Sequence, residues 1–200
     1  MAVSGTKAFE LDVTEYIEEA FERCGLEVRT GYDIRTAKRS LNLMLAEWAN
    51  RGLNQWTIAQ TQVTVVQGQT DYSLGADTIE YLNIPTKSSQ SRVSQFFVDR
   101  QINPTLKVWP APNNSTDILI FDRLVRMDDA DTPINTMELP FRFYPCLAAG
   151  LAYYIAMKRA PDRVQLLKSV YEEEFERAAT EDRDRASFNV QPSLDYYRIN

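Results

Sequence analysis

Three consecutive glutamates and two later aspartates are the residues of this sequence that most suggest catalysis. Glu172, Glu173 and Glu174 precede Asp182 and Asp184, and paired carboxylates can cleave glycosidic bonds when they flank the scissile bond. Consecutive residues of a helix point in different directions, so these carboxylates are not expected to converge on one reacting centre. The pattern favours a charged, solvated helix face over a hydrolase that works with carboxylates alone.

No other set of residues predicts an enzyme. The chain contains no histidine, which removes the commonest metal ligand and the commonest general base, so its serines and thiols have no histidine to activate them. Cys24 and Cys146 each fall within an apolar helical pattern, so we expect small buried hydrophobes in a reducing compartment rather than a disulfide or a redox pair. The turns VQGQT and SLGAD lack the lysine and repeated glycines of a phosphate-binding loop. We predict no catalysis, no cofactor and no metal site.

Length and composition indicate an ordinary globular protein. Two hundred residues allow one domain with a sizeable insertion, and 44% hydrophobic with 25% charged residues is typical of soluble domains. The net charge of -6 argues against a protein that grips nucleic acid, because that binding depends on lysine and arginine neutralising phosphates. DNA could still pass through a larger assembly without sticking. The N-terminal residues MAVSGTKAFELD do not predict a secretory signal, and no membrane partner is expected.

The first quarter of the chain predicts two amphipathic helices. Asp12 and Glu15 have the spacing of a capping box, apolar residues then recur every three or four positions, and Gly25 supplies a stop. A second helix is expected to open at Thr30 and Asp33 and to end before residue 52.

Three basic residues fall off the apolar stripe of this second helix: Arg35, Lys38 and Arg39. A solvated face with nearby acidic partners is the simpler interpretation. The functional alternative is a contact with an acidic surface of another subunit.

At Thr57 the apolar period changes from that of helices to that of strands. Residues 57–126 contain about five short runs rich in valine, threonine and aromatic residues, separated by glycine and proline. They predict a small antiparallel meander. Five aromatic side chains are expected in the sheet core rather than in a binding patch: Tyr81, Phe96, Phe97, Trp109 and Phe121.

Residues 139–179 predict two further helices with a tight corner between them. Residues 141–157 are apolar almost all round, so the third helix is expected to be buried at the centre. Pro161 stops it, and Asp162 can cap a fourth helix. The apolar stripe of the fourth helix is Val164, Leu167, Val170, Tyr171, Phe175 and Ala178.

The predicted fold class is α+β, mainly α, with an antiparallel four-helix bundle, an inserted small antiparallel β domain and an extended C-terminal tail. The bundle would comprise residues 1–56 and 127–187, the β-rich insertion residues 57–126, and the C-terminal arm residues 188–200. Ordering a terminal arm costs conformational entropy, which its contacts within a lone subunit would hardly offset. The apolar side chains of the arm are Phe188, Val190, Leu194, Tyr196, Tyr197 and Ile199. The arm is either a segment for a partner, or folded back on its own domain, or disordered.

The order of these parts resembles that of a known family. The stretches LNLMLAEWANRGLNQWTI, VTVVQGQTDYSL, LKVWPAP, ELPFRFYPCLAAGLAYYIAMKRAP and YEEEFERA are similar to head-to-tail adaptors of short-tailed bacteriophages, also called tail tubular proteins A or head-completion connectors. The resemblance covers nearly the whole chain, and it rests on architecture and loose patterns rather than on an invariant motif.

The resemblance implies a non-enzymatic ring, normally a dodecamer, seated between the portal and the tail nozzle (tail tubular protein B) in the neck of the virion. Such a ring closes the capsid after DNA packaging and passes DNA at ejection without reading its sequence, and it is assembled in the host cytoplasm. Carried onto this chain, the portal contact falls on residues 188–200 and the nozzle contact on residues 57–126. Within such a ring, Arg35, Lys38 and Arg39 are candidates for the subunit interface. A separate hypothesis gives the channel an acidic lining, for which the candidates on the polar face of the fourth helix are Glu172, Glu173, Glu176 and Glu181.

The competing class is a stand-alone helical binding or regulatory module whose β insertion recognises a peptide or a small ligand. A mass measurement separates the two, because an adaptor should be monomeric or ring-forming and should bind portal, whereas a regulator should bind neither portal nor itself.

Overall fold

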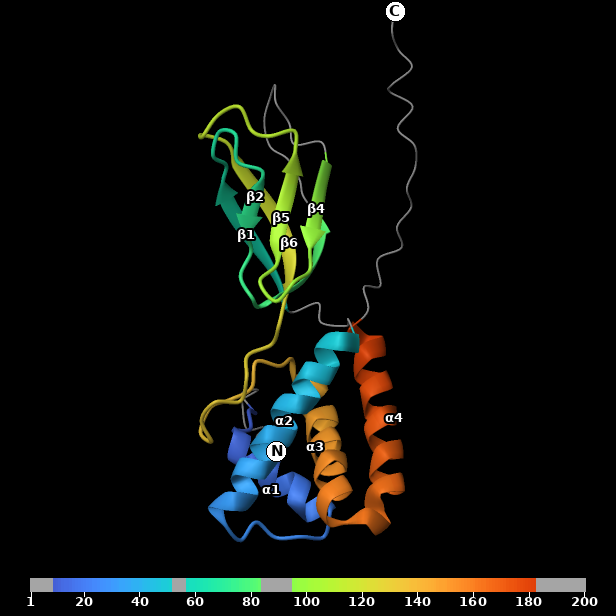
Figure 1. The fold of residues 1–200 in the computed structure, drawn as a ribbon. Helices are drawn as coiled ribbons and strands as arrows, with labels where there is room; N and C mark the ends of the chain where they lie inside the picture. Colours follow the sequence, from blue (N-terminus) through green and yellow to red (C-terminus); the bar gives the residue numbers. More distant parts are fainter. Residues whose placement is uncertain (1–8, 52–56, 84–94, 183–200) are drawn as a thin grey trace, which may run out of the picture.

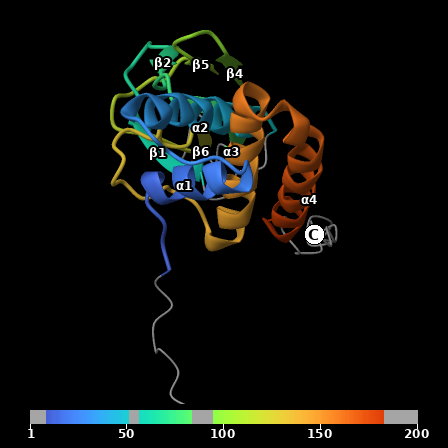
Figure 2. The ribbon, with the colours of Figure 1, turned by 90° about the horizontal axis from the view of Figure 1, so that it is seen from below.

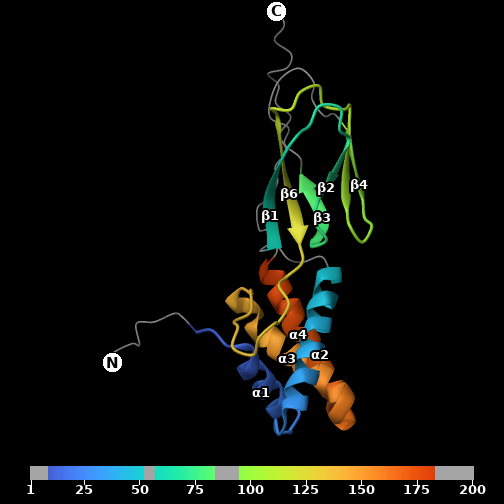
Figure 3. The ribbon, with the colours of Figure 1, turned by 60° about the vertical axis from the view of Figure 1, so that its left-hand side comes forward.

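The computed structural model describes residues 9–51, 57–83 and 95–182, and of residues 79–83 it describes the backbone alone. Helices lie at one end of an elongated molecule and strands at the other (Figure 1; Figure 3). The helical elements are α1 (Val13–Arg23), α2 (Gly31–Arg51), η2 (Phe141–Phe143), α3 (Tyr144–Arg159), η3 (Pro161–Arg163) and α4 (Val164–Asp182). The strands are β1 (Ile58–Thr64), β2 (Asp71–Ser73), β3 (Thr78–Asn83), β4 (Gln95–Asp99), β5 (Thr105–Trp109) and β6 (Ile118–Val125). The predicted mixed class is confirmed, whereas the antiparallel bundle geometry and the C-terminal tail stay predictions.

The start of α1 confirms the predicted capping box. The backbone N–H of Glu15 donates to Asp12 Oδ1 at 2.8 Å, and the backbone N–H of Asp12 donates to Glu15 Oε2 at 2.9 Å. Two of the donors that a helix N-terminus leaves unpaired are thereby satisfied. The helix ends at Arg23, and Gly25 follows with φ 69°, a conformation that glycine adopts without strain.

The third helix is the centre of the helical part, as its all-round apolar sequence predicted. α3 contacts α1, α2 and α4, and it contributes residues such as Leu147, Leu151 and Ile155 to one buried cluster. Tyr153 and Tyr154 are partly buried, and Met157 near the last turn is exposed. Both cysteines are buried, as predicted.

Gly150 marks the closest approach between α3 and its neighbours. A Cβ at this position would lie 2.8 Å from Cε2 of Tyr171 on α4 and would also collide with Sδ of Met44 on α2. Real Cβ atoms essentially never come closer than 3.0 Å to such neighbours. The absence of a side chain at Gly150 therefore lets three helices meet.

A polar network holds the same three helices together. Trp48 Nε1 donates to the Tyr171 hydroxyl at 2.8 Å, and that hydroxyl donates to Glu47 Oε2 at 3.1 Å. The hydroxyl of Tyr154 on α3 donates to the same carboxylate oxygen at 3.2 Å. Burial, the charge of Glu47 and this hydrogen bond raise the pKa of Tyr154 to about 12. Moving the ring of Tyr154 or Tyr171 would break these hydrogen bonds, and a buried polar group without a partner costs free energy. The network therefore holds both rings in place.

The fourth helix differs from its prediction at two positions. Asp162 lies inside the 3-10 turn η3 rather than at a cap, and that turn has no side-chain capping bond. Val170 is exposed rather than part of the buried stripe, whereas Leu167, Tyr171 and Phe175 are buried as predicted. The stripe is narrower than expected because α4 packs mainly against α3 and meets α2 only along the side that carries Tyr171 and Phe175.

The strands form two antiparallel sheets, not the predicted meander. Their orders are β1-β6-β3 and β2-β5-β4, so strands that follow each other in the chain are mostly not neighbours. Buried residues from both sheets, including Tyr72, Leu106 and Phe121, form a second hydrophobic cluster. This cluster shares no residue with the cluster of the helical part.

Three of the five aromatic residues predicted in the sheet core are exposed. Phe121 is fully buried, but Phe96 is 51% exposed, Phe97 64% and Trp109 64%; the side chain of Tyr81 lies outside the described residues. Phe96 and Phe97 are consecutive in β4, and successive side chains of a strand point to opposite faces, so both cannot enter one core. Trp109 of β5 pairs with Gln95 of β4, two residues from Phe97, which places Trp109 and Phe97 on the same outer face.

Candidate interaction surfaces

The carboxylates that suggested catalysis do not converge. Glu172 Oε2 lies 3.3 Å from Arg51 Nη1, while Glu173 Oε1 and Glu174 Oε1 lie 2.8 and 3.0 Å from the guanidinium of Arg177. Asp182 is buried and pairs with Arg142, and Asp184 lies outside the described residues. Glu172 pairs with Arg51, and Glu173 and Glu174 share Arg177, so the three carboxylates do not face one cavity and the arrangement favours a solvated helix face.

Within the described ranges, no cluster of three or more histidine, cysteine, aspartate or glutamate residues could bind a metal ion. Across the same ranges, no helix combines the length and apolar character needed to cross a bilayer.

The predicted channel residues of α4 are brought to its surface. Glu172, Glu173, Glu176 and Glu181 are all exposed. Ion pairs with Arg51 and Arg177 offset part of their charge, so this face is less negative than the sequence suggests. Whether it lines a channel stays a prediction.

The three predicted interface residues of α2, Arg35, Lys38 and Arg39, lie beside Asn42 and Leu43, and we call these five residues the basic face. These five residues line a shallow depression of about 450 Å³. Lys38 Nζ donates to the backbone carbonyl of Asp131 at 2.5 Å, so it is engaged within the subunit. Arg35 and Arg39 are exposed and make no ion pair with any residue that the structure describes.

Further positive charge lies close to the basic face. Lys158 of α3 donates to Ser40 Oγ on α2 at 2.6 Å. Burial lowers the pKa of Lys158, and the charges of Arg39 and Arg159 lower it further. The hydrogen bond to Ser40, which follows Arg39 in the chain, places Lys158 close to the basic face.

An ion pair holds the start of α2 and therefore the basic face. Asp33 is buried, contacts Arg159 Nη2 at 2.5 Å and accepts backbone hydrogen bonds from Arg29 at 3.1 Å and Thr30 at 3.0 Å. Burial acts to raise the pKa of Asp33, but the hydrogen bonds from Arg29, Arg159 and Thr30 together hold that pKa below its usual value. The carboxylate stays charged and fixes the first turn of α2 to the end of α3.

A groove beside α1 was not predicted from the sequence. We call it the acidic groove; it has a volume of about 430 Å³ and is lined by both apolar residues and glutamates. Its lining residues are Phe9, Leu11, Glu15, Glu18, Glu19, Glu22, Arg23, Tyr144, Pro145 and Ala148. Glu15 caps α1 and Glu19 pairs with Arg23 at 2.7 Å. Glu18 and Glu22 are exposed and have no ion pair within the described part of the chain.

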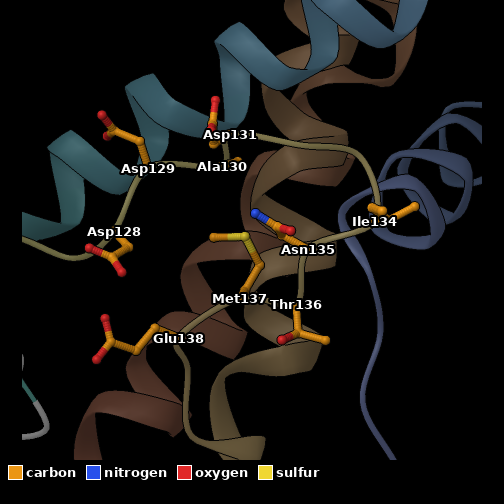
Figure 4. A pocket seen from close by; sticks show the side chains of 9 residues that line it. All are labelled: Asp128, Asp129, Ala130, Asp131, Ile134, Asn135, Thr136, Met137 and Glu138. Carbon is orange, nitrogen blue, oxygen red and sulfur yellow. The ribbon is translucent and has the colours of Figure 1, made fainter.

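A second acidic depression is formed by the segment that returns from β6 to α3 (Figure 4). Its volume is about 550 Å³, and its carboxylates come from one loop: Asp128, Asp129, Asp131 and Glu138. Asp129 pairs with Arg126 at 3.2 Å. Asn42 Oδ1 accepts from the backbone N–H of Ala130 at 2.9 Å, which fastens this loop to α2 on the side of the basic face.

The predicted portal-binding residues cannot be placed. Phe188, Val190, Leu194, Tyr196, Tyr197 and Ile199 all lie outside the described residues, so their role stays a prediction.

Comparison with known proteins gives one family. The family model described as SU10 adaptor protein matches residues 12–193, which include both the helices and the strands. A search of curated protein sequences finds no significant match.

Proposed function

The chain belongs to the SU10 adaptor protein family, whose members are structural adaptors of phages rather than enzymes, and we propose that it is a head-to-tail connector of a short-tailed phage. In this role it forms a ring, a dodecamer, between the portal and the tail nozzle. The ring closes the capsid after DNA packaging and passes DNA at ejection. The family match over residues 12–193 is the observation that carries the proposal.

The arrangement of the two hydrophobic clusters supports a connector. One cluster lies among the helices and the other between the two sheets, at opposite ends of an elongated molecule (Figure 3). A subunit with a separate core at each end can hold two partners apart while contacting both. We propose that residues 57–126 are an inserted domain that meets the nozzle, and that residues 1–56 and 127–187 form the ring wall.

The outer face of the sheet β2-β5-β4 is the proposed nozzle contact. It carries the exposed rings of Phe97 and Trp109, and aromatic residues are enriched in protein interfaces. Lys107 lies opposite Phe97 on this face, and Asp71 at 4.0 Å offsets part of its charge, so the surface is suited to a partner protein more than to DNA.

The C-terminal arm, residues 188–200, is the proposed portal contact. Removing the chain after Ala186 should abolish attachment to portals, because each arm contributes a weak contact that a closed ring multiplies. Cosedimentation with portal rings and counts of DNA-filled, tailed particles measure this. As a matched control, Asn189→Ala with Gln191→Ala changes only polar positions and should leave attachment intact. A truncated protein that still attaches and yields tailed, DNA-filled particles would contradict the proposed portal contact.

The exposed carboxylates of α4 are the proposed channel lining. Glu173→Lys with Glu176→Lys should slow DNA ejection, because lysines would bind phosphates where carboxylates repel them. Ejection triggered in vitro and followed by DNA release measures the effect. Glu27→Lys with Asp162→Lys makes the same change of charge at exposed positions away from this face and should leave ejection unchanged. Normal retention and ejection in the α4 variant would exclude this lining.

A further inference from the structure

We propose that the acidic groove on α1 of one copy receives the basic face on α2 of a neighbouring copy, which makes the subunit contact head-to-tail. The inference rests on the proposed ring and names the two surfaces that would build it. The partner is a second copy of this chain, since the chain itself carries both halves of the contact.

The charged residues of the two surfaces match in sign and in spacing. Glu18 and Glu22 are four residues apart on α1, and Arg35 and Arg39 are four residues apart on α2. Residues at this spacing lie on the same side of a helix with Cβ atoms about 5–6 Å apart. Two helices laid side by side can therefore align both arginines with both glutamates.

The apolar residues of the two surfaces also match. Leu43 follows Arg39 by one helical turn and is 57% exposed. The lining of the acidic groove includes the apolar residues Leu11, Tyr144 and Ala148 as well as its glutamates. Each surface thus carries apolar and charged residues, and the contact would bury Leu43 against these three apolar residues.

The positions of the two surfaces decide the type of contact. α1 and α2 lie next to each other at the helical end (Figure 2), and both bury their opposite faces in the same hydrophobic cluster. The acidic groove and the basic face share no lining residue, so one copy can offer each surface to a different neighbour. Such heterologous contacts generate a ring when the rotation closes, whereas pairing a face with its own copy would bring like charges together.

Charge reversal on each surface separately, and then in combination, tests the contact. Glu18→Lys with Glu22→Lys makes both surfaces basic, and Arg35→Glu with Arg39→Glu makes both acidic. Sedimentation velocity at low salt should show self-association of the wild-type protein and, for each variant alone, association weakened at least about tenfold because like charges now meet. An equal mixture of the two variants should associate again, since every contact between unlike variants regains opposite charges. Added salt should weaken the wild-type contact by screening.

A cross-linking measurement locates the contact directly. A carbodiimide joins a carboxylate to a nearby amine, so an equal mixture of isotope-labelled and unlabelled protein should yield cross-links from Lys38 to Glu18 or Glu22 between different copies. Glu27→Lys with Asp162→Lys changes the net charge as the α1 variant does, but at exposed positions that line neither of the two surfaces, and should associate like the wild type.

Three results would overturn the inference: wild-type protein that stays monomeric at low salt, single-surface variants that associate normally, or a mixture that does not recover. None of them decides the proposed function, which depends on whether the wild-type protein attaches to portals. A protein that attaches to portals but ignores both charge reversals would be an adaptor with a different subunit contact.

Discussion

Gly150→Leu is expected to destabilise the helical part by at least about 3 kcal/mol, the upper end of the usual cost of overpacking a core. The Tyr171 ring cannot move aside, because its hydroxyl is bonded to Trp48 and Glu47 at 2.8 and 3.1 Å. A Cβ at Gly150 would already lie 2.8 Å from that ring, and a leucine adds three more carbons. Urea unfolding followed by far-UV circular dichroism measures the loss.

Two further variants separate overpacking from other effects of the substitution. Gly150→Ala should destabilise the protein less than Gly150→Leu does. The helix propensity of alanine is about 1 kcal/mol more favourable than that of glycine, and this gain offsets part of the cost of the steric collision. Ala46→Leu places the same leucine on an exposed position of α2 and should change the free energy of unfolding by less than about 0.5 kcal/mol. If Gly150→Leu unfolded at the wild-type urea concentration, the close approach of the three helices would be wrong.

The helices could be predicted from the sequence because their determinants are local. The capping box of α1 depends on Asp12 and Glu15, three residues apart, and the all-round apolar character of residues 141–157 identified the central helix without knowledge of its neighbours. The role of Gly150 could not be predicted in the same way. It depends on Met44 and Tyr171, which come from two other helices.

The pairing of the strands could not be predicted because turn residues show where a strand ends, not which strand it joins. β6 pairs with both β1 and β3, so the last strand lies in the middle of its sheet. A meander would place it at an edge. The same uncertainty made the aromatic prediction wrong for Phe97 and Trp109, since the face that a strand residue occupies follows from its pairing.

Of the candidate surfaces, the basic face was predicted and the acidic groove was not. Arg35, Lys38 and Arg39 stand out in the sequence because they interrupt the apolar stripe of one helix. The glutamates of α1 recur at three- and four-residue spacing and could have indicated a charged face. The groove itself also needs Tyr144 and Pro145, which pack beside α1 from more than a hundred residues away in the chain.

Phe121→Ala is expected to cost the β part about 3–5 kcal/mol, as for other large buried aromatic residues. Phe121 is fully buried between the sheets, and a part with so small a core has little stability in reserve. The helical part should keep its stability, because the two hydrophobic clusters share no residue.

Hydrogen exchange resolved by peptide measures each part separately. In Phe121→Ala, amides of β1, β5 and β6 should lose protection while those of α3 keep it. Phe97→Ala removes the same side chain from an exposed position of β4 and should leave protection almost unchanged. Equal loss of protection in α3 would show that residues 57–126 are not a separate domain. With the helical part intact, Phe121→Ala should still self-associate through α1 and α2 and should fail only in the step that needs the β part, the joining of the nozzle.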